Sequence, residues 1–132
     1  MQVYLDTSAL MKLVVLEPET PALRTYLTQY PDDVRFTAAL SRTELLRAVR
    51  RSGSYELAAQ AHRLLGRLDL VAMTTRLLDE AGTIGPPELR TLDAIHLAAA
   101  RTAPALRSLV TYDLRLAAAA EAVGVTVATP PQ

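Results

Sequence analysis

The sequence predicts an α/β fold: a single-domain, three-layer α/β/α sandwich with a mostly parallel central sheet. Two observations support this prediction. Short apolar strands alternate with helical patterns along the whole chain, and such alternation favours parallel strands joined by right-handed crossover helices on both faces of the sheet. Residues 1–132 also lack any Gly-, Ser- or Pro-rich linker long enough to divide the chain, so we expect one domain.

The first half of the chain predicts two strands and four helices. A buried strand over residues 2–5 precedes Thr7 and Ser8, which are expected to form a turn and an N-cap. Proline is favoured in the first turn of a helix, and Gly53 is expected to stop the third helix. The second strand covers residues 34–37, and the helices cover residues 9–16, 18–30, 41–51 and 54–67.

The second half predicts three strands and three helices. A strand over residues 69–73 leads to a helix that Thr74 caps and that fades at residues 82–85, before the extended Pro86-Pro87 loop. Gly124 is expected to end the last helix. The remaining elements are helices over residues 91–101 and 114–123 and strands over residues 108–111 and 125–127.

Composition restricts the possible functions. The absence of cysteine excludes disulfides, thiolate metal sites and a cysteine nucleophile. With 14 basic and 14 acidic residues, the net charge of zero argues neither for nor against a nucleic-acid partner. Asp6 interrupts the N-terminus before a signal peptide could form, and charges break the one apolar N-terminal stretch before it could span a membrane. We therefore expect no membrane association and a cytoplasmic location.

Four acidic residues, Asp6, Glu44, Asp93 and Asp113, lie at the ends of strands or the starts of helices. Each has a local structural explanation. Asp6 and Asp113 could be helix N-caps, and Glu44 could complete a capping box with Ser41. Asp93 could stabilise the start of a helix that is capped by Thr91.

Together, the four acids predict a site that none of the local explanations requires. Ligands of open parallel sheets bind outside the carboxyl ends of the strands, next to helix N-termini. Carboxylates that meet there repel one another unless a hard cation such as Mg²⁺ or Mn²⁺ neutralises them. Ser8 and Thr111 lie beside two of the acids. Their hydroxyls could hold a metal-ligand carboxylate or a metal-bound water, although capping or strand-end hydrogen bonds explain them equally well.

The same motifs resemble those of PIN-domain nucleases. Asp6-Thr7-Ser8-Ala9-Leu10 is similar to the opening motif of that family, and the segments around Glu44, Asp93 and Asp113 are similar to its later acidic motifs. Chain length and motif order resemble the VapC-type toxins of bacterial toxin–antitoxin pairs. The resemblance implies a PIN-like sandwich and a Mg²⁺- or Mn²⁺-dependent endoribonuclease. It also implies a small antitoxin partner, an RNA substrate and a homodimer.

In this interpretation, Asp6, Glu44, Asp93 and Asp113 are the catalytic set, and Asp6, Asp93 and Asp113 bind the metal. A metal-activated water would attack the RNA phosphodiester and leave 5′-phosphate and 3′-hydroxyl ends. An exposed face with Arg47, Arg50 and Arg51 could bind RNA, or could simply be solvated. His96 is expected to be buried with one ring nitrogen bonded, and His62 to be exposed, so neither is assigned to the site.

Two other functions fit the sequence less well. A metal-dependent phosphatase of the haloacid-dehalogenase type could have Asp after its first strand. However, the chain lacks a second Asp two residues after Asp6, and Lys12, its only lysine, lies too near the start for that family's later lysine motif. The other alternative is a non-enzymatic binding module in which all four acids are helix caps. Metal-dependent stabilisation that is lost on Asp6→Asn would separate a nuclease from a binding module.

Overall fold

The structure, a computed structural model, describes residues 1–131. Within these residues, five strands and seven helices follow one another in the predicted order. The strands are β1 (Gln2–Leu5), β2 (Val34–Ala38), β3 (Asp69–Val71), β4 (Leu106–Val110) and β5 (Val127–Ala128). The helices are α1 (Thr7–Val14), α2 (Thr20–Thr28), α3 (Leu40–Arg50), α4 (Tyr55–Leu65), α5 (Thr75–Ala81), α6 (Thr91–Ala100) and α7 (Leu114–Ala122).

The sheet has the order β3-β2-β1-β4-β5, and every strand pair is parallel. Strand β1 is central: Tyr4 is in register with Phe36 on one neighbour and with Leu109 on the other. The chain first builds the sheet outward on one side of β1 and then crosses to β4 on the other side. The strand order therefore reverses between β1 and β4, where open parallel sheets place their ligands.

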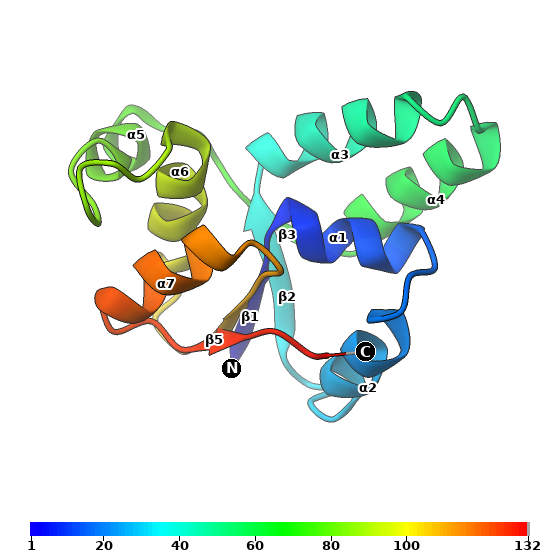
Figure 1. Ribbon diagram of the computed structural model, residues 1–132, viewed down its shortest axis with the longest axis horizontal. Coiled ribbons are helices and arrows are strands. Elements are labelled where there is room, and N and C mark those ends of the chain that lie inside the picture. Colours follow the sequence, from blue (N-terminus) through cyan, green and yellow to red (C-terminus); the bar gives the residue numbers. More distant parts are fainter. Residues whose placement is uncertain (132) are drawn as a thin grey trace.

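Two hydrophobic cores lie on opposite faces of the sheet. Along β1, Val3 and Leu5 pack into the core below α1 to α4, whereas Tyr4 between them packs into the core below α5 to α7. This alternation follows from the two-residue period of a strand. Figure 1 shows the resulting layers, with α1 to α4 on one side of the sheet and α5 to α7 on the other. The predicted three-layer α/β/α sandwich is confirmed.

Some predicted boundaries shift because individual backbone groups find other partners. Helix α1 begins at Thr7 with Asp6 as its N-cap, so the prediction that Thr7 and Ser8 form a turn was wrong. The last strand begins at Val127, not at residue 125, because the Val125 amide donates to the Ala120 carbonyl at the end of α7. Gly124 ends α7 as predicted, with a φ of 82° that favours glycine.

Among the described residues, no helix is both long enough and apolar enough to cross a membrane.

Candidate active site

Asp6 links the end of β1 to the start of α1. Its Oδ1 accepts hydrogen bonds from the Ala9 amide (2.9 Å) and the Ser8 hydroxyl (2.6 Å), and its Oδ2 accepts one from the Thr111 hydroxyl (2.5 Å). Burial raises the pKa of Asp6, although these three hydrogen bonds oppose the shift. The predicted N-cap is therefore real. It does not exclude a functional role, because the other carboxylate oxygen faces Thr111, which directly follows β4.

Thr111 and Ser8 join the ends of β4 and β1. The Thr111 hydroxyl, which donates to Asp6, also accepts the Asp113 amide (3.0 Å), and the Ser8 hydroxyl accepts the Tyr112 amide (2.9 Å). Both hydroxyls thus contact Asp6. Their predicted role in supporting a metal site stays a prediction.

Asp113 is the N-cap of α7, as predicted from its position. Its Oδ1 accepts hydrogen bonds from the amides of Arg115 (2.9 Å) and Leu116 (3.3 Å). Its Oδ2 is directed elsewhere and accepts a bond from Arg90 Nη2 at 3.4 Å. As with Asp6, one carboxylate oxygen caps a helix while the other accepts a hydrogen bond from a residue outside that helix.

Arg90 connects Asp113 to Asp93. Its Nε lies 3.3 Å from Asp93 Oδ2, so one guanidinium group spans both carboxylates. Asp93 is buried in the first turn of α6, but the predicted Thr91 cap was wrong. Arg90 occupies the N-cap position without a capping side-chain bond, and Thr91 is the first helical residue. Sequence reasoning missed Arg90. The only signal in the sequence was the position of Arg90, three residues before Asp93.

The predicted capping box at Glu44 was also wrong. Helix α3 starts at Leu40 with Ala39 at its N-cap position, which leaves Ser41 inside the helix. The Ser41 hydroxyl hydrogen-bonds the Thr37 hydroxyl at 2.6 Å within the core. Glu44 is thereby free of the helix terminus and points toward α1 and α6.

Glu44 Oε1 accepts hydrogen bonds from the Thr7 hydroxyl (2.7 Å) and from His96 Nε2 (2.8 Å). Burial by itself would raise the pKa of Glu44. The hydrogen bonds from His96 and Thr7 outweigh that effect and lower its pKa below the ordinary value. Glu44 is therefore ionised at neutral pH, and Thr7, which follows Asp6 directly, brings it to the same edge of the sheet.

His96 is buried, as predicted, but both of its ring nitrogens are bonded, where one was expected. Its Nδ1 lies 2.6 Å from the Tyr4 hydroxyl, which also accepts the Ala38 amide (3.2 Å). Burial raises the pKa of Tyr4, so that hydroxyl keeps its proton. In the tautomer with its proton on Nε2, the imidazole donates to Glu44 and accepts the Tyr4 proton at Nδ1. Sequence reasoning left His96 out of the site, although it follows Asp93 by three residues on the same helix.

The arginines of α3 and the second histidine lie at the surface. Arg47 and Arg50 are exposed in the last turn of α3, and Arg51 is exposed at its C-cap position. In the part of the chain that the structure describes, no acidic side chain forms an ion pair with any of the three. Their predicted RNA contact stays a prediction. His62 is exposed, as expected.

Comparison with known proteins decides the family. The family model described as "PIN domain" matches residues 3–122, which include all four acids. The chain belongs to the PIN-domain family. The family predicted from the sequence is thus confirmed.

Full-length relatives of this PIN domain carry the VapC name. It is 49% identical over 131 residues to Ribonuclease VapC46 and 45% identical over 131 residues to Ribonuclease VapC47, both of Mycobacterium tuberculosis. These alignments cover 97% of this chain in both cases and 97% and 96% of the relatives.

Solved structures show the same fold. A toxin–antitoxin complex from Klebsiella pneumoniae matches with a TM-score of 0.71 and 16% identity, over 98% of each chain. VapBC2 from Rickettsia felis, bound to a promoter DNA fragment, also matches with a TM-score of 0.71, at 15% identity over 97% of this chain and 98% of the other. At these identities the comparison supports the fold of the PIN domain.

The potential ligands at this edge are of the type that hard divalent cations prefer, because they are carboxylate oxygens supported by hydroxyls. Their present arrangement includes a positive charge, since the Arg90 guanidinium lies between Asp93 and Asp113. Within residues 1–131, no group of three or more Asp, Glu or His side chains is placed to hold one ion. The site thus offers suitable ligands, two of which are paired with an arginine.

Proposed function

We propose that this PIN domain is a metal-dependent endoribonuclease and the toxin of a toxin–antitoxin pair. One observation carries the proposal: four acids distant in sequence are connected at one edge of the sheet. Thr111 connects Asp6 to Asp113, and Arg90 connects Asp113 to Asp93. Thr7, the neighbour of Asp6, bonds Glu44. Helix capping alone does not require these connections.

Asp6, Asp93 and Asp113 would hold Mg²⁺ or Mn²⁺, and Arg90 would then withdraw from the two carboxylates that it joins. When bound, such an ion supplies Lewis-acid stabilisation of phosphate charge and activation of water. Ser8 and Thr111 hold the Asp6 carboxylate in place by their hydroxyl groups. Glu44 would contribute a fixed negative charge.

An RNA substrate is supported by the full-length relatives, both of which are named ribonucleases. The exposed Arg47, Arg50 and Arg51 follow Glu44 along α3 and would contact backbone phosphates. Neutral Arg→Gln substitutions there should weaken RNA binding most at low salt and leave metal binding unchanged.

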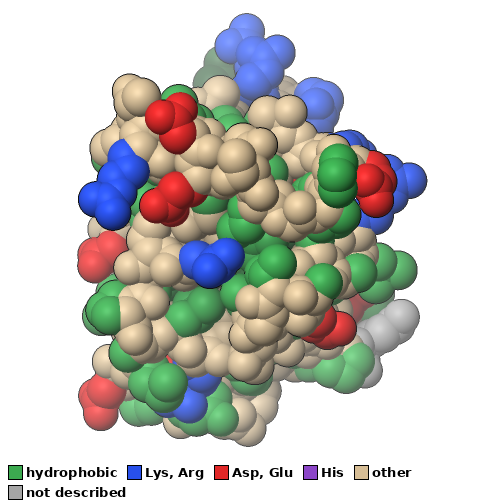
Figure 2. All heavy atoms as spheres, turned by 90° about the vertical axis from the view of Figure 1, so that its left-hand side faces the viewer, with side chains coloured by type: hydrophobic (Ala, Val, Ile, Leu, Met, Phe, Trp, Pro, Cys, Tyr) green, Lys and Arg blue, Asp and Glu red, His purple; other side chains and the backbone are tan. Residues whose placement is uncertain are grey.

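An antitoxin partner is supported by the structural neighbours, since one is a toxin–antitoxin complex. Two exposed leucines lie beside the acids: Leu92 in the first turn of α6 is 47% exposed, and Leu114 in the first turn of α7 is 80% exposed. Figure 2 shows the face over α5 to α7, where hydrophobic side chains are interspersed with acidic and basic ones. A partner segment with apolar groups and one basic side chain would suit this edge. A homodimer is expected as well, and light scattering of the purified chain would test it.

The proposal is tested by incubating purified protein with RNA and Mg²⁺ or Mn²⁺, and by sequencing the RNA ends. The parent chain should leave 5′-phosphate and 3′-hydroxyl ends, and EDTA should stop cleavage. Asp93→Asn should abolish cutting, whereas Asp79→Asn, the same change at an exposed position of α5, should not. Equal cutting by the parent and Asp93→Asn would overturn the site assignment. Hydrolysis of small phosphomonoesters with RNA left intact would favour a phosphatase.

A further inference from the structure

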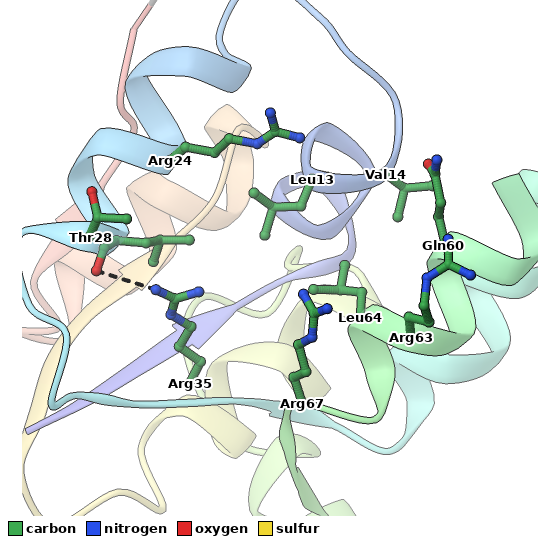
Figure 3. Close-up of a pocket in the computed structure, with 10 residues that line it drawn as sticks. Leu13, Val14, Arg24, Thr28, Arg35, Gln60, Arg63, Leu64 and Arg67 are labelled. Atoms are coloured by element: carbon green, nitrogen blue, oxygen red, sulfur yellow. Dashed lines mark hydrogen bonds between the residues drawn. The ribbon is translucent and has the colours of Figure 1, made fainter.

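A pocket lined by four arginines lies on the layer formed by α1, α2 and α4. It has a volume of about 380 Å³. Arg24 comes from α2, Arg35 from β2 and Arg63 from α4, while Arg67 follows the end of α4. Figure 3 shows these side chains reaching the same space from different elements. We call this feature the arginine pocket.

The charge of the arginine pocket is largely uncompensated by the protein. None of its lining residues is acidic. Among residues 1–131, the one ion pair of these arginines joins Arg63 to Glu56 at 4.0 Å, and both side chains are mostly exposed. Arg35 Nη2 donates to the Leu27 carbonyl at 3.4 Å, which fixes that guanidinium at the edge of the pocket. A concave surface with one sign of charge attracts and concentrates a ligand of the opposite sign.

The accessible groups of the arginine pocket favour phosphate over an apolar segment. Of its four apolar lining residues, Leu27 and Val14 are buried, at 4% and 7% exposed, and Leu13 and Leu64 are half-buried. By contrast, Arg24, Arg63 and Arg67 are exposed. Guanidinium groups bind phosphate oxygens through paired hydrogen bonds. Because the arginines come from separate elements around one hollow, a chain with several negative charges would satisfy them better than a single carboxylate.

We infer that the arginine pocket binds backbone phosphates of the RNA strand, as a site separate from the acidic edge. This inference rests on the proposed function for the choice of RNA. Helix α1 relates the two sites: Asp6 caps its N-terminus, and Leu13 and Val14 in its last turn line the pocket. Eight helical residues span about 12 Å, so the pocket would hold phosphates a few nucleotides from the cleaved bond. It would thereby anchor the substrate without touching the reacting groups.

The test measures binding of a labelled single-stranded RNA by fluorescence anisotropy over a series of KCl concentrations. The parent chain carries Asp93→Asn so that the RNA stays intact. Adding Arg24→Gln and Arg67→Gln should weaken binding about tenfold at low salt and reduce the slope of log affinity against log salt by about 1.4. Arg76→Gln with Arg101→Gln, the same charge change at exposed positions elsewhere, should leave affinity and slope close to the parent values.

A second double variant, Arg24→Lys with Arg67→Lys, guards against a folding defect. It keeps both charges and should recover most of the salt slope. If the glutamine variant binds RNA with the parent's affinity and slope, the pocket assignment is overturned, while the parent's RNA binding leaves the proposed function intact. If the glutamine variant loses binding to an acidic peptide but binds RNA as the parent does, the pocket assignment is overturned in favour of protein docking. If the parent binds no RNA, both proposals fail.

Discussion

His96 Nε2 lies 2.8 Å from Glu44 Oε1, and this bond joins α6 to α3 across the end of the sheet. Behind it, the Tyr4 hydroxyl bonds the other ring nitrogen. Tyr4 belongs to the central strand, so a residue of the core sets the orientation of a carboxylate at the surface of the site. At metal sites, mutating groups that orient other residues in this way typically lowers metal affinity or activity by about 10–100-fold.

Tyr4→Phe should reduce both stability and RNA cleavage. The change leaves the Ala38 amide and His96 Nδ1 without their buried partner, which should lower the free energy of unfolding by about 1–3 kcal/mol. The imidazole would also lose the bond that places its proton on Nε2. Denaturant unfolding and cleavage assays measure the two effects. Tyr26→Phe is the matched control, because it also loses a hydroxyl bond, to Ser108 at 2.7 Å, but lies outside the site. Full cleavage by Tyr4→Phe would count against the positioning role.

Glu44 and His96 should act as one unit in cleavage. Glu44→Gln and His96→Gln should each lower kcat/KM by roughly 10–100-fold, because either change removes the charge or the donor that defines their contact. The double variant should lose less than the product of the two single losses, with a coupling of about 0.5–3 kcal/mol. Steady-state kinetics of the four proteins give this value. Independent, additive losses would mean that the two residues do not cooperate.

Asp6→Asn should stabilise the metal-free protein at neutral pH. Burial raises the pKa of Asp6 above its ordinary value of 3.8, so the native state loses stability as pH rises from that value through the raised pKa. Asparagine carries no charge and is also a good N-cap. The melting temperature should therefore increase by a few degrees at pH 7, and this gain should vanish toward pH 3.8. Asp79→Asn should show no such trend, and a lower melting temperature for Asp6→Asn at pH 7 would contradict the prediction.

Arg90→Ala should strengthen the stabilisation of the protein by Mn²⁺. Without its guanidinium, Asp93 and Asp113 lose their bridging cation. Because the Arg90 side chain is itself exposed to solvent, the metal-free protein should be destabilised by only about 1 kcal/mol or less. A metal ion would then no longer have to displace the arginine. Thermal melts over a Mn²⁺ titration should show a larger rise at lower metal concentration. Arg76→Ala, which removes an exposed ion pair with Glu80, is the control. An unchanged metal response would show that Arg90 does not compete.

Local sequence signals were enough to predict the layers and to single out acids that the structure connects at one edge of the sheet. Each strand could be recognised as a short apolar run, and Asp6 and Asp113 are found where parallel strands end. Both residues turned out to be helix caps and members of the connected acidic set, because each uses a different carboxylate oxygen for each contact. The interpretation of Asp6 and Asp113 as helix caps is therefore compatible with their interpretation as candidate site residues.

The remaining features depend on tertiary contacts that short patterns do not encode. The spacing of Ser41 and Glu44 matches a capping box, but a core bond to Thr37 and an outward bond to His96 override it. A single histidine on an apolar helix gives no sign that Tyr4, 92 residues away, will bond it. The arginine pocket is hidden for the same reason, since each arginine appears in sequence as one ordinary polar position.

The placement of Asp6 at the end of β1 also bears on how this protein can be switched off. The middle strand of a sheet is among the last segments to open in hydrogen exchange, and β1 contributes side chains to both cores. Freeing Asp6 by local melting of β1 would thus require disrupting both cores. We therefore expect the proposed nuclease to be controlled by a molecule that covers these acids while the scaffold beneath them stays rigid.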